Sequence, residues 1–150
     1  MNSLLQVASD ALQPESHAED KLLLMQMAMK CSDVSNPAKP KALYDRWTAG
    51  IMQEFFEQGD EEKRRGLKVS AFMDRETTIV SKCQVGFIKF VVEPIYNALG
   101  KYLGPVRDTQ LQLLAANLDD QDSQLADIEA RAEADKAIKE ADAEAAAAEA

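Results

Sequence analysis

Few side chains in this chain of 150 residues offer chemistry, and the most informative ones lie in two short segments. Asp33 precedes a Ser-Asn-Pro turn; carboxylates bind divalent cations, but an isolated Asp at such a place normally caps the turn. Gln84 offers an amide that both donates and accepts hydrogen bonds, but a lone Gln on an amphipathic helix is normally solvated. Residue type alone leaves both interpretations open.

Histidine and cysteine are scarce. The single histidine, His17, stands at a predicted helix start several turns before Asp33, where we interpret it as an exposed residue. Cys31 and Cys83 lack the CxxC spacing of a thiolate zinc site and are too few for a disulfide framework, which fits a reducing cytosol. One carboxylate and one distant histidine do not build a four-ligand zinc site.

Two helices are predicted around Asp33. Residues 17–33 repeat Leu, Met and Ala with a helical period after two acidic residues, which predicts a buried helix ending near Asp33. The two prolines in residues 35–40 end that helix and start the next. Residues 40–58 predict a second helix, on which four apolar residues share one face: Leu43, Trp47, Ile51 and Phe55.

A break is expected after the second helix. Gly59 is expected to end it, and the charged residues 61–65 to form a short solvated helix or turn that ends at Gly66. Residues 67–74 have no periodic pattern, and their apolar members suggest a loop folded back over the protein.

The rest of the chain is also predicted to be helical. Residues 78–103 form a long helix that Pro94 should kink, and residues 108–118 form another amphipathic helix. An Ala/Glu/Asp/Lys tail follows, with too few large apolar residues for a core or a coiled coil. No period-2 strand appears, so the predicted fold class is all-α, a helical bundle with an acidic helical or disordered tail. The predicted divisions are residues 1–16, 17–118 and 119–150.

The charge pattern excludes some partners. The formal net charge is −9, but residues 119–150 hold 11 acidic and 3 basic residues and account for most of it. No cluster of Lys and Arg with aromatic residues favours nucleic acid, and no apolar run is long enough for a membrane segment. The first residues lack the basic region of a secretory signal, so a cytoplasmic location is expected. The acidic tail suits a basic protein partner.

Four blocks of residues resemble, in order and spacing, the class I 3′,5′-cyclic-nucleotide phosphodiesterases. They are residues 30–40, 44–48, 54–60 and 83–88. The resemblance covers roughly residues 17–103. It implies the C-terminal part of an all-helical catalytic domain, in which two metals, usually Zn and Mg (or Mn), activate a hydroxide that attacks the cyclic phosphate.

The resemblance also implies roles for individual residues. Asp33 matches a metal-ligand position, and Gln84 matches the glutamine that hydrogen-bonds the purine. Phe87 matches the aromatic that stacks on the purine and Ile51 the aliphatic on its other side, whereas periodicity alone would place both in the core. Asn36 matches a position that contacts the base in cAMP-selective members, which favours cAMP over cGMP. The expected pocket-wall and scaffold residues are Tyr44, Trp47, Thr48, Phe55 and Phe72.

The catalytic histidine and the remaining metal ligands of that family have no counterpart in this sequence. We expect a fragment of a complete enzyme, inactive in isolation; a natural half-domain that no longer catalyses is the second interpretation. Either would expose apolar surface, which predicts poor stability or self-association. Two other functions stay open: an interaction module that uses the acidic tail, and a helical bundle without a ligand.

Overall fold

Helices form all the regular secondary structure of the described residues. The computed structural model describes residues 17–148, and the side chains of residues 17–141. The predicted N-terminal segment, residues 1–16, lies outside them. The elements, in chain order, are α2 (Ala18–Asp33), the 3-10 turn η1 (Asn36–Ala38), α3 (Lys41–Arg64), α4 (Val80–Phe87), the π turn η2 (Ile88–Val92), α5 (Glu93–Gly100), the π turn η3 (Val106–Gln110) and α6 (Leu111–Ala148). Residues 17–148 contain no strand, which confirms the all-α prediction there.

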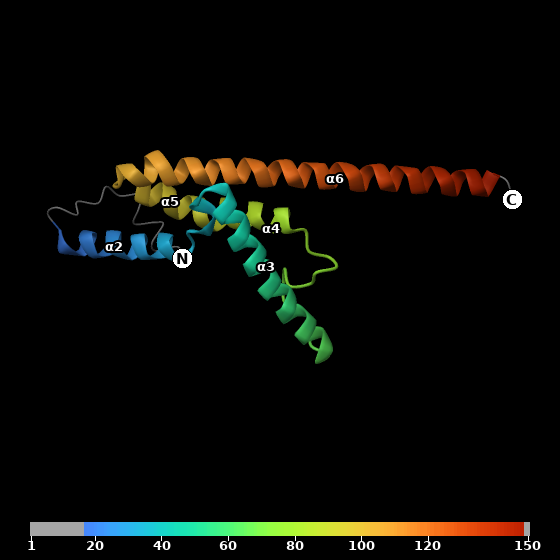
Figure 1. Cartoon of the computed structure of the whole chain (residues 1–150), viewed down its shortest axis with the longest axis horizontal. Coiled ribbons are helices and arrows are strands. Elements are labelled where there is room, and N and C mark those ends of the chain that lie inside the picture. The colour runs from blue at the N-terminus through green and yellow to red at the C-terminus, as the bar shows by residue number, and fades with distance from the viewer. Residues whose placement is uncertain (1–16, 149–150) are drawn as a thin grey trace.

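α2, α4, α5 and α6 form a layered bundle, and α3 leaves it at an angle (Figure 1). α5 lies between α2 and α6 and contacts both, and α4 packs along α6. α3 starts at the bundle beside η1 and then points away from it, and the chain after α3 returns as a loop to α4. The C-terminal half of α6 extends past the other helices.

The core lies where these elements meet. Tyr44 from α3, Ile88 and Val92 from η2, and Leu114 from α6 are among the largest fully buried side chains. Tyr96 of α5 is also buried and donates a 2.8 Å hydrogen bond from its hydroxyl to the Cys31 carbonyl at the end of α2. The core therefore joins α2 to the elements that follow it.

The prediction that α2 is buried is wrong for most of its surface. Among its side chains only Met27 and Cys31 are buried. Leu22, Met25 and Met29 are 56%, 58% and 65% exposed. α2 packs mainly on α5, so only one face of α2 is covered. The helical period of the sequence shows that a helix has an apolar face, but it does not show how many faces other helices cover.

The predicted break at Gly59 is also wrong, because α3 continues to Arg64. A glycine inside a helix costs about 1 kcal/mol relative to alanine, which neighbouring packing can offset. The residue that stops the helix is Gly66, directly after the C-cap Arg65, where φ is +68°. There the Gly66 N–H donates to the Lys63 carbonyl and the Leu67 N–H to the Glu62 carbonyl, which is a Schellman motif.

Pro94 is accommodated by a π turn. The helical path runs from Val80 to Gly100, and η2 lies directly before α5, whose second residue is Pro94. Because proline lacks an N–H and crowds the carbonyl four residues earlier, a local change of helical winding relieves the conflict. Before Pro94, where the sequence analysis expected a kink, the structure has a π turn within a continuous helical path.

α6 runs unbroken through the boundary that the sequence suggests near residue 118. Leu114, Asn117 and Gln121 are buried, whereas every side chain from residue 126 to residue 141 is exposed. Lys41 pairs with Asp120 at 3.1 Å and Lys89 with Asp122 at 2.9 Å, so the start of the acidic segment contacts the bundle. Within the described part of the chain, no helix combines the length and apolar character that a membrane span requires.

Candidate nucleotide-binding site

A cavity of about 860 Å³ lies between α3, the loop after it and α4. Its wall is mostly apolar, as in pockets that bind small organic ligands. Seven of the ten residues singled out in the sequence line it: Asp33, Asn36, Ile51, Phe55, Phe72, Gln84 and Phe87. Residues from four separate segments of the chain thus converge on one cavity.

Gln84 is the buried polar side chain of this cavity. It is 6% exposed, and its Oε1 accepts a 3.1 Å hydrogen bond from the Tyr44 hydroxyl. Tyr44 is fully buried, and burial raises the pKa of its hydroxyl to about 12, so it stays a neutral donor. The same amide carries a donor, Nε2, which suits an acceptor atom of a ligand in the cavity.

Apolar side chains from α3, from α4 and from the loop between them line the same cavity as the amide. Phe87 follows Gln84 by three residues on α4, so the two share a helix face, and Ile51 comes from α3. Phe55 and Phe72 add two more aromatic rings. A planar heterocycle with a polar edge fits this combination of stacking surfaces around one amide.

The turn that carries Asn36 is fixed by α6. Asn117 is 2% exposed, and its Nδ2 donates 2.8 Å hydrogen bonds to the carbonyl oxygens of Pro37 and Lys39. These bonds hold η1, whose first residue is Asn36, against the bundle. Asn36 lines the cavity and is partly buried.

Asp33 lies at the C-terminal end of α2, exposed and at the edge of the same cavity. A metal ion needs several ligands, and residues 17–148 contain no group of three or more His, Cys, Asp or Glu side chains that could hold one. The described residues therefore do not complete a metal site, and Asp33 supplies a single carboxylate.

Three expected pocket residues lie outside the cavity wall. Tyr44 is behind Gln84, as described, and Thr48 is buried one turn later on the same face of α3. Trp47 is 55% exposed and lines a separate groove of about 500 Å³ on α3. Ile51 lines both hollows.

The cavity wall also includes residues that the sequence did not single out as site residues. Phe90 and Val91 follow Phe87 by three and four positions, so the helical period around Gln84 could have revealed them. Leu125 comes from α6, in the segment set apart as a tail, and no sequence signal placed it there. The remaining ones are Val34, Met52, Lys82, Cys83, Val85 and Gly86.

Comparison with known proteins identifies related sequences. The profile of the 3′5′-cyclic nucleotide phosphodiesterase family matches residues 1–114. The match begins at residue 1, so it includes the segment that the sequence analysis set apart from the resemblance, and it ends within α6.

Individual relatives agree with this match. The 3′,5′-cyclic-AMP phosphodiesterase 4 of Dictyostelium discoideum is 49% identical over 81 residues, which are 54% of this chain and 8% of that protein. The 3′,5′-cyclic-AMP phosphodiesterase 4C of Rattus norvegicus is 41% identical over 98 residues, which are 65% of this chain and 18% of that protein. The chain thus spans a small part of these curated relatives.

A solved structure has the same fold. The structure of LmjPDEB1 in complex with IBMX superposes with a TM-score of 0.71 and 25% sequence identity. The similarity covers 83% of this chain and 37% of the solved one. The helical arrangement is therefore part of a larger known domain fold.

Proposed function

The chain belongs to the 3′,5′-cyclic nucleotide phosphodiesterase family, and we propose that it forms the nucleotide-binding part of an enzyme that hydrolyses 3′,5′-cAMP to 5′-AMP, with cGMP as a second candidate substrate. One observation carries the proposal: Gln84, Phe87 and Ile51 converge on one cavity, with the Gln84 amide held by Tyr44. The proposal includes a cytoplasmic location, supported by two free cysteines.

Each part of the cavity has a role in binding the base. Phe87 stacks on the purine and Ile51 packs on its other face, while the apolar wall excludes water. The adenine edge offers an acceptor beside a donor, which pairs with the Nε2 and the remaining lone pair of Oε1 of Gln84. A guanine edge has the reverse order and pairs with the reversed amide. Asn36 adds a polar contact at the edge of the cavity.

Hydrolysis needs groups beyond these. We assign Asp33 to one ligand position of a Zn and Mg (or Mn) site, whose other ligands must come from outside the described residues. Such metals would lower the pKa of a bound water that attacks the phosphate. The described residues themselves account for binding and orienting the nucleotide.

The experiment is a calorimetric titration of the 150-residue chain with cAMP and cGMP, combined with an assay for 5′-AMP. We expect cAMP to bind without hydrolysis. Gln84→Ala should weaken binding about tenfold, since it removes two hydrogen bonds, and Phe87→Ala by about tenfold or more, since it removes a stacking ring. Gln26→Ala on the exposed side of α2 is the matched control. Absence of binding at millimolar cAMP, or equal weakening by Gln26→Ala, would contradict the proposal.

A second candidate function is a non-catalytic interaction module that uses α6. The exposure of every side chain from residue 126 to residue 141 supports it, because the acidic segment is available to a basic protein partner. Deleting residues 130–150 discriminates between the two functions. The deletion should leave cAMP binding unchanged if the cavity is the functional site, and it should abolish capture of a basic partner if the tail is.

A further inference from the structure

The loop between α3 and α4 contributes an aromatic wall to the cavity although it has no regular secondary structure. Phe72 in this loop lines the same cavity as Gln84 and Phe87, yet 61% of it is exposed. Its φ angle is +67°, in the left-handed region that bulky residues rarely adopt. Such a conformation persists only where the surroundings fix it, so something must hold this loop.

The first restraint is a backbone contact at Gly59. This glycine of α3 is buried, and a Cβ atom added to it would lie 1.8 Å from the carbonyl oxygen and 3.2 Å from the Cβ of Met73. The residue next to Phe72 therefore rests directly on the helix, at a distance that only glycine allows. Gly50, nine residues earlier on α3, has nothing within 4 Å of the same added atom.

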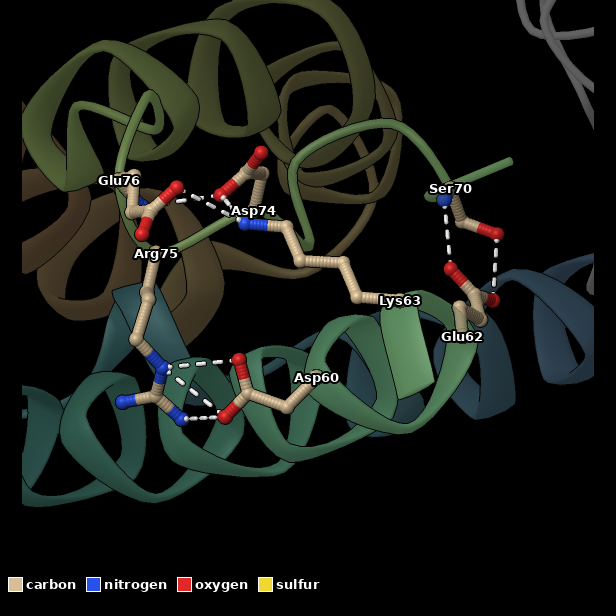
Figure 2. Close-up of polar contacts among 7 residues, drawn as sticks. All are labelled: Asp60, Glu62, Lys63, Ser70, Asp74, Arg75 and Glu76. Carbon is tan, nitrogen blue, oxygen red and sulfur yellow. Dashed lines mark hydrogen bonds and ion pairs between the residues drawn. The ribbon is translucent and has the colours of Figure 1, made fainter. Parts of the chain in front are cut away.

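The second restraint is a set of polar contacts between the end of α3 and the loop on both sides of Phe72 (Figure 2). Before Phe72, the N–H and the hydroxyl of Ser70 donate to the Glu62 carboxylate at 2.6 and 2.8 Å. After it, Lys63 donates to Asp74 at 2.8 Å and to Glu76 at 3.1 Å.

Arg75 completes the set. Its Nε donates to both Asp60 oxygens, at 3.1 and 3.0 Å, and its guanidinium lies 5.5 Å above the Phe56 ring. Asp60 follows Gly59, so the backbone contact and this paired contact share one turn of α3. Figure 2 shows the Asp60–Arg75 pair. Exposed ion pairs are individually weak, but a bidentate Arg–carboxylate pair within a network has a defined geometry.

We propose that Gly59 and the Asp60–Arg75 pair are positioning residues of the cavity: they latch the loop onto α3, so that Phe72 forms a wall of the nucleotide site. The role in nucleotide binding rests on the proposed function, whereas the latch itself does not. The latch also explains why α3 continues through Gly59, where a break was predicted. The loop packs on the helix residues that follow Gly59 and so stabilises this part of α3.

The experiment compares Gly59→Ala with Gly50→Ala in the 150-residue chain. Amide hydrogen exchange of residues 68–79 should accelerate about tenfold in Gly59→Ala, since the added methyl group displaces Met73, and α5 should be unaffected. Gly50→Ala should leave the amide exchange of both the loop and α5 unchanged. A 4-fluorophenylalanine at position 72 should show a changed fluorine shift in Gly59→Ala alone. An unchanged shift and unchanged loop exchange would overturn the proposal.

A charge-reversal cycle provides the second set of variants. Asp60→Arg and Arg75→Asp should each move the fluorine shift and weaken cAMP binding severalfold, and the double variant should restore both. Loss without restoration would overturn the role of the pair. If the wild-type chain binds no cAMP, the proposed function fails, but the fluorine shift and loop exchange still decide whether the latch positions Phe72.

Discussion

Tyr44 and Gln84, 40 residues apart in the chain, meet in the core, where the Tyr44 hydroxyl donates a 3.1 Å hydrogen bond to Gln84 Oε1. Both side chains are buried, at 0% and 6% exposure, so this contact is shielded from competing water. The tyrosine therefore restricts the rotation of the amide that faces the cavity.

Tyr44→Phe tests this restriction. The variant keeps the buried ring but leaves Gln84 Oε1 without its donor, so cAMP affinity should fall by roughly fivefold, equivalent to about 1 kcal/mol. Discrimination between cAMP and cGMP should also narrow, because the amide can then adopt both orientations. Calorimetric titration with each nucleotide measures both effects.

Tyr96→Phe is the matched control for that variant. Tyr96 is also buried, but its hydroxyl donates to the Cys31 carbonyl and not to a cavity residue. The control should lose a similar amount of stability and keep its nucleotide affinity. An equal loss of affinity in both variants would show that the effect is global.

Asn117→Ala should destabilise the chain and disturb the turn that carries Asn36. The buried carbonyl of Pro37 and the partly buried carbonyl of Lys39 would lose their donor, and an unsatisfied buried group costs about 1–3 kcal/mol. Urea denaturation measures the free energy of unfolding. Asn97→Ala, at an exposed position of α5, should change it by less than about 0.5 kcal/mol. Equal effects of the two substitutions would refute the role of Asn117.

The sequence revealed the helices and seven of the 16 residues that line the cavity, because both depend on local period and on matching blocks. It did not reveal that α3 passes through Gly59, since the reason is a contact with Met73 from a loop that returns to the helix. The sequence also did not reveal the Tyr44–Gln84 and Asn117–Pro37 hydrogen bonds, because the residues in each pair are far apart in the chain. The separations are 40 positions for the first pair and 80 for the second.

The predicted burial of α2 failed for a related reason. A helical period shows that a helix has an apolar face, but the number of covered faces depends on how many partners pack on it. Here α5 covers the face of Met27 and Cys31, and Leu22 and Met29 stay exposed. The expected self-association follows directly from that exposed surface.

Self-association should therefore depend on the exposed residues of α2. Leu22, Met25 and Met29 present apolar surface to solvent, and its burial between chains is favourable. Sedimentation velocity should show a mass that rises with concentration, and the double substitution Leu22→Gln and Met29→Gln should reduce it. Ile138→Gln, at an exposed site on α6, is the control. A monomer at all concentrations with a sharp cooperative thermal transition would refute the prediction.

Stability should decrease in alkaline solution because three buried groups hold their protons more tightly in the folded chain. Burial raises the pKa of Cys31 from 9.0 to about 11 and the pKa values of Tyr44 and Tyr96 from 10.0 to about 12. Each raised pKa contributes stability that is complete below the unfolded-state value and is lost as the pH rises through the folded-state value.

The contribution of these groups to the free energy of unfolding should thus be constant below about pH 8. It should fall from about pH 9 upward, by at most about 3 kcal/mol for each group. Urea denaturation across this range measures the slope. In Cys31→Ala the decline should begin about one pH unit later, because the tyrosines then titrate first. A wild-type chain that keeps its stability up to about pH 12, or a Cys31→Ala variant with an unchanged onset, would show that burial does not hold these protons.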